Sequence, residues 1–113
     1  MKKMVFLLIG LVVASTAAFA HPPSDIKIQF DDNTKTLTAV IQHRVSNPQS
    51  HFIKKVDIGL NGREVQMLPF AKQDNNATQT VKITIPEAKK GDVLSVEGYC
   101  NLSGNLSKEI KVA

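Results

Sequence analysis

Four side chains in this 113-residue chain have the chemistry to bind a transition metal: its three histidines and its single cysteine. Imidazole nitrogen is a ligand for zinc, copper and iron, and thiolate sulfur binds soft and borderline metals. The four residues are His21, His43, His51 and Cys100, and each stands at the end of a sequence segment rather than in the middle of one. We therefore expect one metal site made of all four, provided that the fold brings these segment ends together.

His21 has a special position because it follows a stretch typical of a secretory signal peptide. Two lysines precede a short apolar run, and residues 18–20 read Ala-Phe-Ala, a small-residue cleavage motif. The apolar run is too short to span a membrane. We interpret residues 1–20 as a signal peptide and 21–113 as one exported domain with a periplasmic or secreted location. Cleavage after residue 20 would expose the α-amine of His21 beside its imidazole.

The elements that must position these side chains are predicted to be strands. Apolar and polar residues alternate along most of the mature chain, which is the period of a half-buried strand, and Asn61-Gly62 is a strong hairpin signal. No segment has a helical pattern. The expected fold is an all-β, immunoglobulin-like antiparallel β-sandwich of about seven strands. The predicted strands are residues 25–30, 35–43, 51–60, 63–68, 77–85, 93–100 and 106–112.

Three of the candidate ligands lie next to predicted turns. His43 and His51 flank the polar loop at residues 46–50, and Cys100 ends a strand just before a turn at residues 101–104. Strand ends that meet at one pole of a sandwich can carry a site on a rigid scaffold. A lone cysteine in an exported protein can instead be buried, reactive or paired between chains, which leaves a homo-oligomer open.

The composition argues against two classes of partner. The formal net charge of +4 includes two lysines of the leader, and the remaining lysines are scattered. The chain has no tryptophan and no basic run interleaved with aromatic residues, so we expect no nucleic-acid binding. No second apolar span follows the leader, so no membrane association is expected after cleavage.

Several segments of the chain resemble the superoxide reductases, the desulfoferrodoxin and neelaredoxin iron proteins. Residues 99–104, Tyr-Cys-Asn-Leu-Ser-Gly, are similar to the Cys-Asn-x-His-Gly segment of that family. His51-Phe52-Ile53 is similar to its His-Tyr-Ile strand, and His43 with the following loop resembles its His-Pro…His segment with a longer gap. His21 falls where the family has its first histidine ligand. The similarity spans nearly the whole mature chain at low identity.

The resemblance implies a function and a ligand set. Such proteins hold one iron ion, cycling between Fe2+ and Fe3+, with four equatorial histidines and an axial cysteine thiolate. Ferrous iron reduces superoxide to hydrogen peroxide at the open sixth position, and an electron donor restores it. The resemblance therefore implies iron as cofactor, superoxide as substrate, an unidentified electron donor as partner, and His21, His43, His51 and Cys100 as ligands. If the protein is an enzyme, it is a superoxide reductase.

Two departures from the family pattern bear on this interpretation. Ser103 stands where the family has its fourth histidine, and no lysine can precede His21 in the mature chain. A neutral serine hydroxyl is a poor ligand for ferrous iron, so one equatorial position lacks a ligand. We hypothesise that the α-amine of His21 fills it, since an amine with an ordinary pKa of about 7.7–8.0 loses its proton readily on metal binding. The family's lysine, which attracts superoxide, has no counterpart.

Three other interpretations stay open from the sequence. A periplasmic copper-binding protein would use His21 through its amine and ring nitrogen, because copper outcompetes other divalent ions at nitrogen sites. A sulfur-oxidation carrier-type subunit would bind a partner chain and no metal. A sandwich without any site would leave His43 and His51 exposed and distant from Cys100.

Overall fold

The computed structural model describes residues 21–113 as seven strands, so the predicted signal peptide lies outside the described residues. Each strand forms where β-branched and other apolar residues alternate with polar ones, a pattern that suits a pleated surface with one buried face. The strand ends fall within two residues of the predicted ones. The strands are β1 (Asp25–Asp31), β2 (Thr36–Gln42), β3 (Ile53–Leu60), β4 (Arg63–Pro69), β5 (Thr78–Thr84), β6 (Val93–Cys100) and β7 (Asn105–Lys111).

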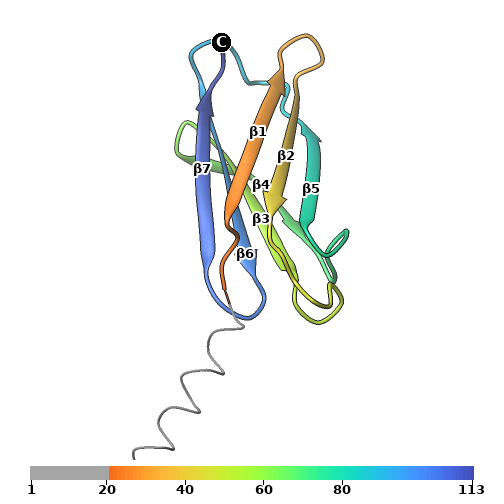
Figure 1. Cartoon of the computed structure of the whole chain (residues 1–113). Coiled ribbons are helices and arrows are strands. Elements are labelled where there is room, and N and C mark those ends of the chain that lie inside the picture. Colours follow the sequence, from red (N-terminus) through yellow and green to blue (C-terminus); the bar gives the residue numbers. More distant parts are fainter. Residues whose placement is uncertain (1–20) are drawn as a thin grey trace, which may run out of the picture.

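The strands form two antiparallel sheets that pack face to face, which confirms the predicted β-sandwich (Figure 1). One sheet has the order β1-β2-β5 and the other has the order β4-β3-β6-β7. The ion pair between Lys108 of β7 and Asp25 of β1, at 3.2 Å, links the two sheets along one side. The architecture leaves the connections between strands at the two ends of the molecule, where a site can form.

The core lies between the sheets and is built from alternate residues of the facing strands. In β2, Leu37, Ala39 and Ile41 are fully buried, and in β6 Leu94 and Val96 are fully buried. Burial of each such aliphatic side chain contributes about 1.5–3 kcal/mol relative to exposure. The same alternation continues beyond the end of β2. The inward-facing positions that follow Ile41 therefore lie at the end of the core, next to the β2–β3 connection.

The predicted hairpin between β3 and β4 is confirmed. Asn61 and Gly62 have φ angles of 53° and 84°, the positive values that a two-residue turn of type I′ requires.

The start of β3 differs from the prediction. The strand begins at Ile53 rather than at His51, and Ile53 is fully buried whereas Phe52 is half-buried. The pairing register of β3 with β6 shifts between Ile53 and Lys55. This bulge places Ile53 and Val56 on the same inward face although they are three positions apart, which simple alternation does not anticipate.

The start of β1, the β2–β3 connection and the β6–β7 turn all lie at one end of the sandwich, and the C-terminus lies at the other (Figure 1). Within residues 21–113, no helix has the length and apolar character needed to span a membrane.

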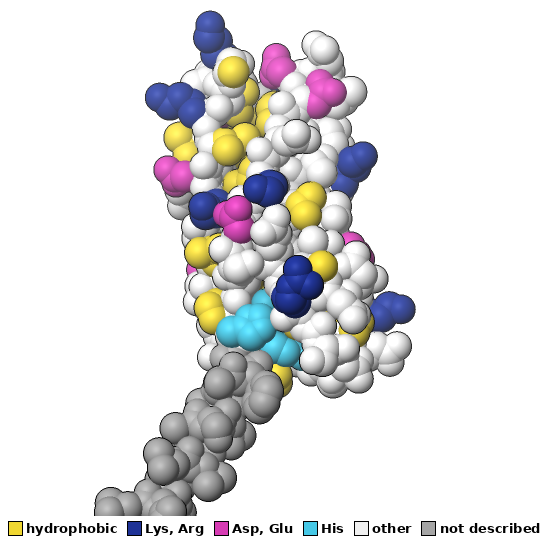
Figure 2. Space-filling view, viewed as in Figure 1, with side chains coloured by type: hydrophobic (Ala, Val, Ile, Leu, Met, Phe, Trp, Pro, Cys, Tyr) yellow, Lys and Arg dark blue, Asp and Glu magenta, His cyan; other side chains and the backbone are white. Residues whose placement is uncertain are grey.

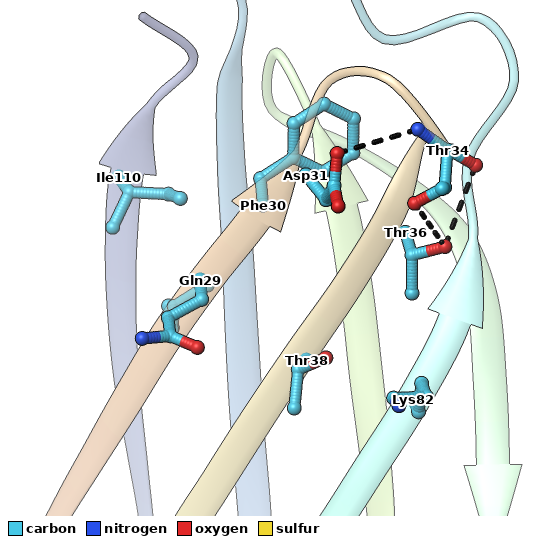
Figure 3. Close-up of a pocket in the computed structure, with 9 residues that line it drawn as sticks. Gln29, Phe30, Asp31, Thr34, Thr36, Thr38, Lys82 and Ile110 are labelled. Carbon is cyan, nitrogen blue, oxygen red and sulfur yellow. Dashed lines mark hydrogen bonds between the residues drawn. The ribbon is translucent and has the colours of Figure 1, made fainter.

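A surface hollow of about 820 Å³ lies away from the histidines along β1, β2 and β5 (Figure 3). It is broad and open. At its edge the backbone N–H of Thr34 donates to the Asp31 carboxylate at 3.4 Å, and the Thr34 hydroxyl donates to the Thr36 hydroxyl at 2.9 Å. Its lining contains no histidine or cysteine and consists of Ile28, Gln29, Phe30, Asp31, Thr34, Thr36, Thr38, Lys82 and Ile110.

Candidate metal centre

The three histidines converge at the end of the sandwich where β1 begins. The centroids of the His21, His43 and His51 rings lie 4.8–5.0 Å from one another, so the rings form a nearly equilateral triangle. One ligand nitrogen from each ring lies within 4.8 Å of the other two. Figure 2 shows imidazole surface at this end, with a basic side chain beside it. Residues 30 positions apart in sequence thus form one cluster of nitrogen ligands.

His43 is held by the extension of the β2–β5 ladder. Its backbone N–H donates to the carbonyl of Ala77 at 2.9 Å, and Val45 likewise donates to Asn76 at 2.8 Å. Because it keeps the inward parity of Ile41, the His43 ring continues the buried face of β2 and is 0% exposed. A sandwich without a site predicts an exposed His43, so this observation contradicts that interpretation.

Gln73, in the β4–β5 connection, is the polar partner of the His43 ring. Its Oε1 lies 2.8 Å from Nδ1 of His43, and its Nε2 donates to the His43 carbonyl at 2.8 Å. The other ring nitrogen of His43, Nε2, lies 3.1 Å from the carbonyl oxygen of His21. A hydrogen bond from the distal ring nitrogen to an oxygen acceptor is the usual support of a metal-binding histidine.

His51 is placed by the loop before β3 and by the turn after β6. Its backbone N–H donates to the Asn47 carbonyl at 2.9 Å, which closes the loop on itself. The Asn101 side chain accepts a hydrogen bond from Phe52 N–H at 2.8 Å and donates to the Ser50 carbonyl at 3.1 Å. Both neighbours of His51 are therefore tied to the same amide side chain.

The Nε2 atom of His51 is buried and has no hydrogen-bond partner among the described residues. Burial, followed by the nearby His43 and His21, holds the pKa of His51 below its ordinary value of 6.5. A lowered pKa keeps the ring neutral and its lone pair free over a wider pH range. Leaving a buried polar atom without a partner costs on the order of 1–3 kcal/mol, and a metal ion at this position removes that cost.

His21 is placed by the residue that follows it. Pro22 packs against Gly104, where a Cβ atom would lie 2.8 Å from Pro22 Cβ, and Gly104 has a φ angle of 81°. Both facts favour glycine at position 104. The His21 ring directs Nδ1 toward the Pro22 carbonyl at 3.0 Å. Its Nδ1 therefore has an acceptor, and Nε2 is the nitrogen left for a metal.

The hypothesis that the His21 α-amine binds the metal requires a different ring position. An amine and an imidazole of the same histidine close a six-membered chelate ring only through Nδ1. In this structure Nδ1 of His21 faces the Pro22 carbonyl. The amine stays a predicted ligand, and its binding requires that Nδ1 leave Pro22 after cleavage.

Cys100 lies at the end of β6 and is 4% exposed. Its backbone pairs with Ile53, so it belongs to the same end of the sandwich as His51. The group of mutually close ligand atoms found within residues 21–113 consists of the three histidines and does not include Cys100. Its Sγ accepts a hydrogen bond from the N–H of Leu102 at 3.4 Å. The axial role of Cys100 stays a prediction, and Ser103 is exposed in the turn.

An open hollow of about 600 Å³ borders the histidine cluster. Of the described residues, Arg44 is the lysine or arginine that lines it, and no aspartate or glutamate of the described part of the chain does so. The Arg44 side chain therefore gives this hollow a positive charge beside the imidazoles of His21 and His51. The other lining residues are His21, Val45, Ser46, Asn47, Ser50, His51, Asn76 and Leu102.

The spacing of the nitrogens fits a single metal ion. Metal–imidazole bonds of about 2.0–2.1 Å allow two nitrogens on one metal to lie at most about 4.2 Å apart. The nitrogens here lie within 4.8 Å of one another. Side-chain rotations that move them by on the order of 1 Å would bring all three within bonding distance of one ion. Three protein ligands leave coordination positions for water or a small molecule, as in catalytic metal sites.

Sequence patterns did not reveal the supporting residues Gln73 and Arg44. Gln73 lies in a connection without hydrophobic period, and its contact with His43 spans 30 residues. Asn101 belongs to the Cys-Asn segment, but the sequence did not predict its support of the loop before β3. Asn after a strand end is a common turn residue that bonds to nearby backbone.

Comparisons with protein-family models, with curated proteins and with solved structures found no match to this chain. The described residues are accordingly those of an all-β sandwich with a three-histidine cluster that could hold a metal, and its family is not assigned.

Proposed function

We propose that this exported protein binds one transition-metal ion through the imidazoles of His21, His43 and His51. The single observation that carries the proposal is the convergence of the three rings, with a buried Nε2 of His51 that has no hydrogen-bond partner within residues 21–113. Every histidine of the chain takes part. The His43 ring is buried, the pKa of His51 is lowered, and the Nδ1 atoms of His21 and His43 each face an oxygen acceptor. An accidental cluster would not combine these features.

The finer proposal is that the metal is iron and that the protein reduces superoxide. The Cys-Asn and His-Phe-Ile segments support it, and so does the hollow with Arg44, which favours an anion. Iron held by His21, His43 and His51 would supply the electron that, with two protons, converts superoxide to hydrogen peroxide, and an electron donor would have to restore the ferrous ion. The protein's own part is to hold the ion through three imidazoles, attract the anion with Arg44 and admit water to the open side.

A copper site is the second candidate, because the cluster offers nitrogen ligands alone. Among divalent ions, copper binds such sites most tightly. A thiolate ligand would give intense charge-transfer absorption, whereas three imidazoles would not. The spectrum of the metal-loaded protein therefore separates copper on nitrogen ligands from a site that also uses Cys100.

The test is metal analysis of the protein after export from its native host, followed by titration of the metal-free form with Fe2+, Cu2+ and Zn2+. We expect one ion per chain and an affinity that falls at least 100-fold in His51→Gln and in His21→Gln. Arg44→Gln, a neighbour without a ligand role, should keep the affinity. A protein that binds no ion, or binds it equally well in both histidine variants, contradicts the proposal.

The superoxide proposal has its own test. When superoxide is generated by pulse radiolysis, it should oxidise the bound iron in stoichiometric amounts. Hydrogen peroxide should form, and no molecular oxygen should be released. If superoxide does not oxidise the bound ferrous iron, the proposed reductase activity is wrong, while the proposed metal-binding function stands.

A further inference from the structure

We infer that Gln73 is a positioning residue that fixes the proton of His43 on Nδ1 and thereby assigns Nε2 as the ligand atom. The inference rests on the proposed metal site and adds to it the residue that prepares its most buried ligand. Gln73 belongs to the connection between β4 and β5, which contributes no ligand of its own.

The orientation of the Gln73 amide is determined by its other hydrogen bonds. Its Nε2 donates to two carbonyls, that of His43 at 2.8 Å and that of Asn75 at 2.9 Å. Rotating the amide by 180° would set its oxygen against both carbonyls. Gln73 is 3% exposed, so water does not relieve such a repulsion. The oxygen must therefore face the ring.

The orientation of the amide decides the state of the imidazole. An oxygen 2.8 Å from Nδ1 of His43 is an acceptor only, so Nδ1 carries a hydrogen. A neutral imidazole with a hydrogen on Nδ1 has its lone pair on Nε2. In this structure Nε2 lies 3.1 Å from the carbonyl oxygen of His21, so metal binding through Nε2 requires that this carbonyl move away. Once it has moved, the neutral ring offers the metal the lone pair of Nε2.

Gln73 also connects to the segment that carries the second ligand. Its backbone N–H donates to the carbonyl of Pro48 at 2.9 Å, in the loop between His43 and His51. One residue therefore holds the His43 ring, the His43 carbonyl and the loop before His51. Loss of its side chain should affect the geometry of the site more than the stability of the sandwich.

Gln73→Met keeps the length of the side chain and removes the acceptor. Supporting residues of this kind change metal affinity by about 10–100-fold when substituted, and we expect a loss in that range. Gln73→Glu keeps an oxygen acceptor for Nδ1 but sets its second oxygen against the carbonyls of His43 and Asn75, so it should recover part of the affinity lost in Gln73→Met at a cost in stability. It should also lower the reduction potential of a bound iron or copper, because the carboxylate makes the imidazole more electron-rich.

Gln79→Met is the matched control. Gln79 is 2% exposed and its side chain also makes three hydrogen bonds, but these go to Asp74 and Thr80 rather than to a histidine. We expect a loss of stability similar to that of Gln73→Met and no change in metal affinity. Equal affinity losses in both variants would show a general structural effect and overturn the inference.

Nitrogen-15 NMR of the imidazoles in the metal-free protein gives an independent result. At about two pH units above the ordinary histidine pKa of 6.5, His43 should be the Nδ1–H tautomer in the parent protein and a mixture in Gln73→Met. A parent protein with the Nε2–H tautomer overturns the inference whether or not the protein binds metal. Failure to bind metal, with the expected tautomer, contradicts the proposed function and leaves the assignment of the proton intact.

Discussion

Asn101 accepts a 2.8 Å hydrogen bond from the backbone N–H of Phe52, the residue after His51. The Asn101 N–H in turn donates to the Phe52 carbonyl at 2.9 Å, and its side chain reaches Ser50. The turn that follows Cys100 therefore fixes the loop that presents His51. The Cys-Asn pair and the histidine are parts of one assembly although 49 positions separate Asn101 from Phe52.

Asn101→Ala should weaken metal binding through His51. The substitution removes both side-chain hydrogen bonds to the loop and leaves the Phe52 N–H without its partner, at a cost of about 1–3 kcal/mol in the free energy of unfolding. We expect about a 10-fold loss of metal affinity, measured by competition with a chromophoric chelator. Asn61→Ala is the control, because Asn61 links two turns at the other end through its side chain. An equal loss of affinity in both variants would contradict this account.

Gly104→Ala should displace the segment that carries His21. The new methyl group would lie 2.8 Å from Pro22, and the φ angle of 81° adds strain of about 1–2 kcal/mol for a non-glycine residue. Gly91→Ala is the matched control, since Gly91 has a φ angle of 90° and nothing lies within 4 Å of its added Cβ. Both variants should lose stability in urea unfolding, but only Gly104→Ala should lose metal affinity. Unchanged affinity would show that Pro22 does not position His21.

Most of the fold and part of the site could be predicted from the sequence. Alternation defined the strands, and His43 shares the parity of Ile41, which the structure shows to be buried. The register shift near Ile53 could not be predicted, because a bulge changes parity without a sequence signal in the strand. Gln73 could not be identified either, since its role depends on a tertiary contact between a loop and a strand end.

The stability of the domain should fall in acid through Asp92. Hydrogen bonds from the side chain of Asn61 and the backbone of Lys89, followed by the Lys89 side chain, hold the pKa of Asp92 below its ordinary value of 3.8. A carboxyl whose pKa is lowered by folding contributes stability above its unfolded pKa and loses it as the pH falls through the folded value. The free energy of unfolding should therefore decrease below about pH 4.

Asp92→Asn isolates this contribution. The variant should be less stable than the parent near pH 7, and the difference between the two should shrink as the pH falls below 4. Urea titrations followed by circular dichroism at several pH values measure both curves. Parallel curves would show that Asp92 does not contribute to the acid sensitivity.

Arg44→Gln should slow the reaction of the iron-loaded protein with superoxide at low ionic strength. Arg44 is the charged lining residue of the hollow beside the histidines, and a positive charge there raises the encounter rate of an anion. We expect a decrease of up to about 10-fold that disappears at high salt, where such attraction is screened. Lys90→Gln, at an exposed position in the turn before β6, is the control. Identical rates and salt dependence for parent and Arg44→Gln would exclude this role.

X-ray absorption at the metal edge of the exported, metal-loaded protein is the most direct test of the site. The account predicts one ion per chain bound by three imidazoles, with scattering from the outer ring atoms, and the loss of one imidazole in His51→Gln. A spectrum without imidazole scattering, or one that His51→Gln leaves unchanged, would contradict it.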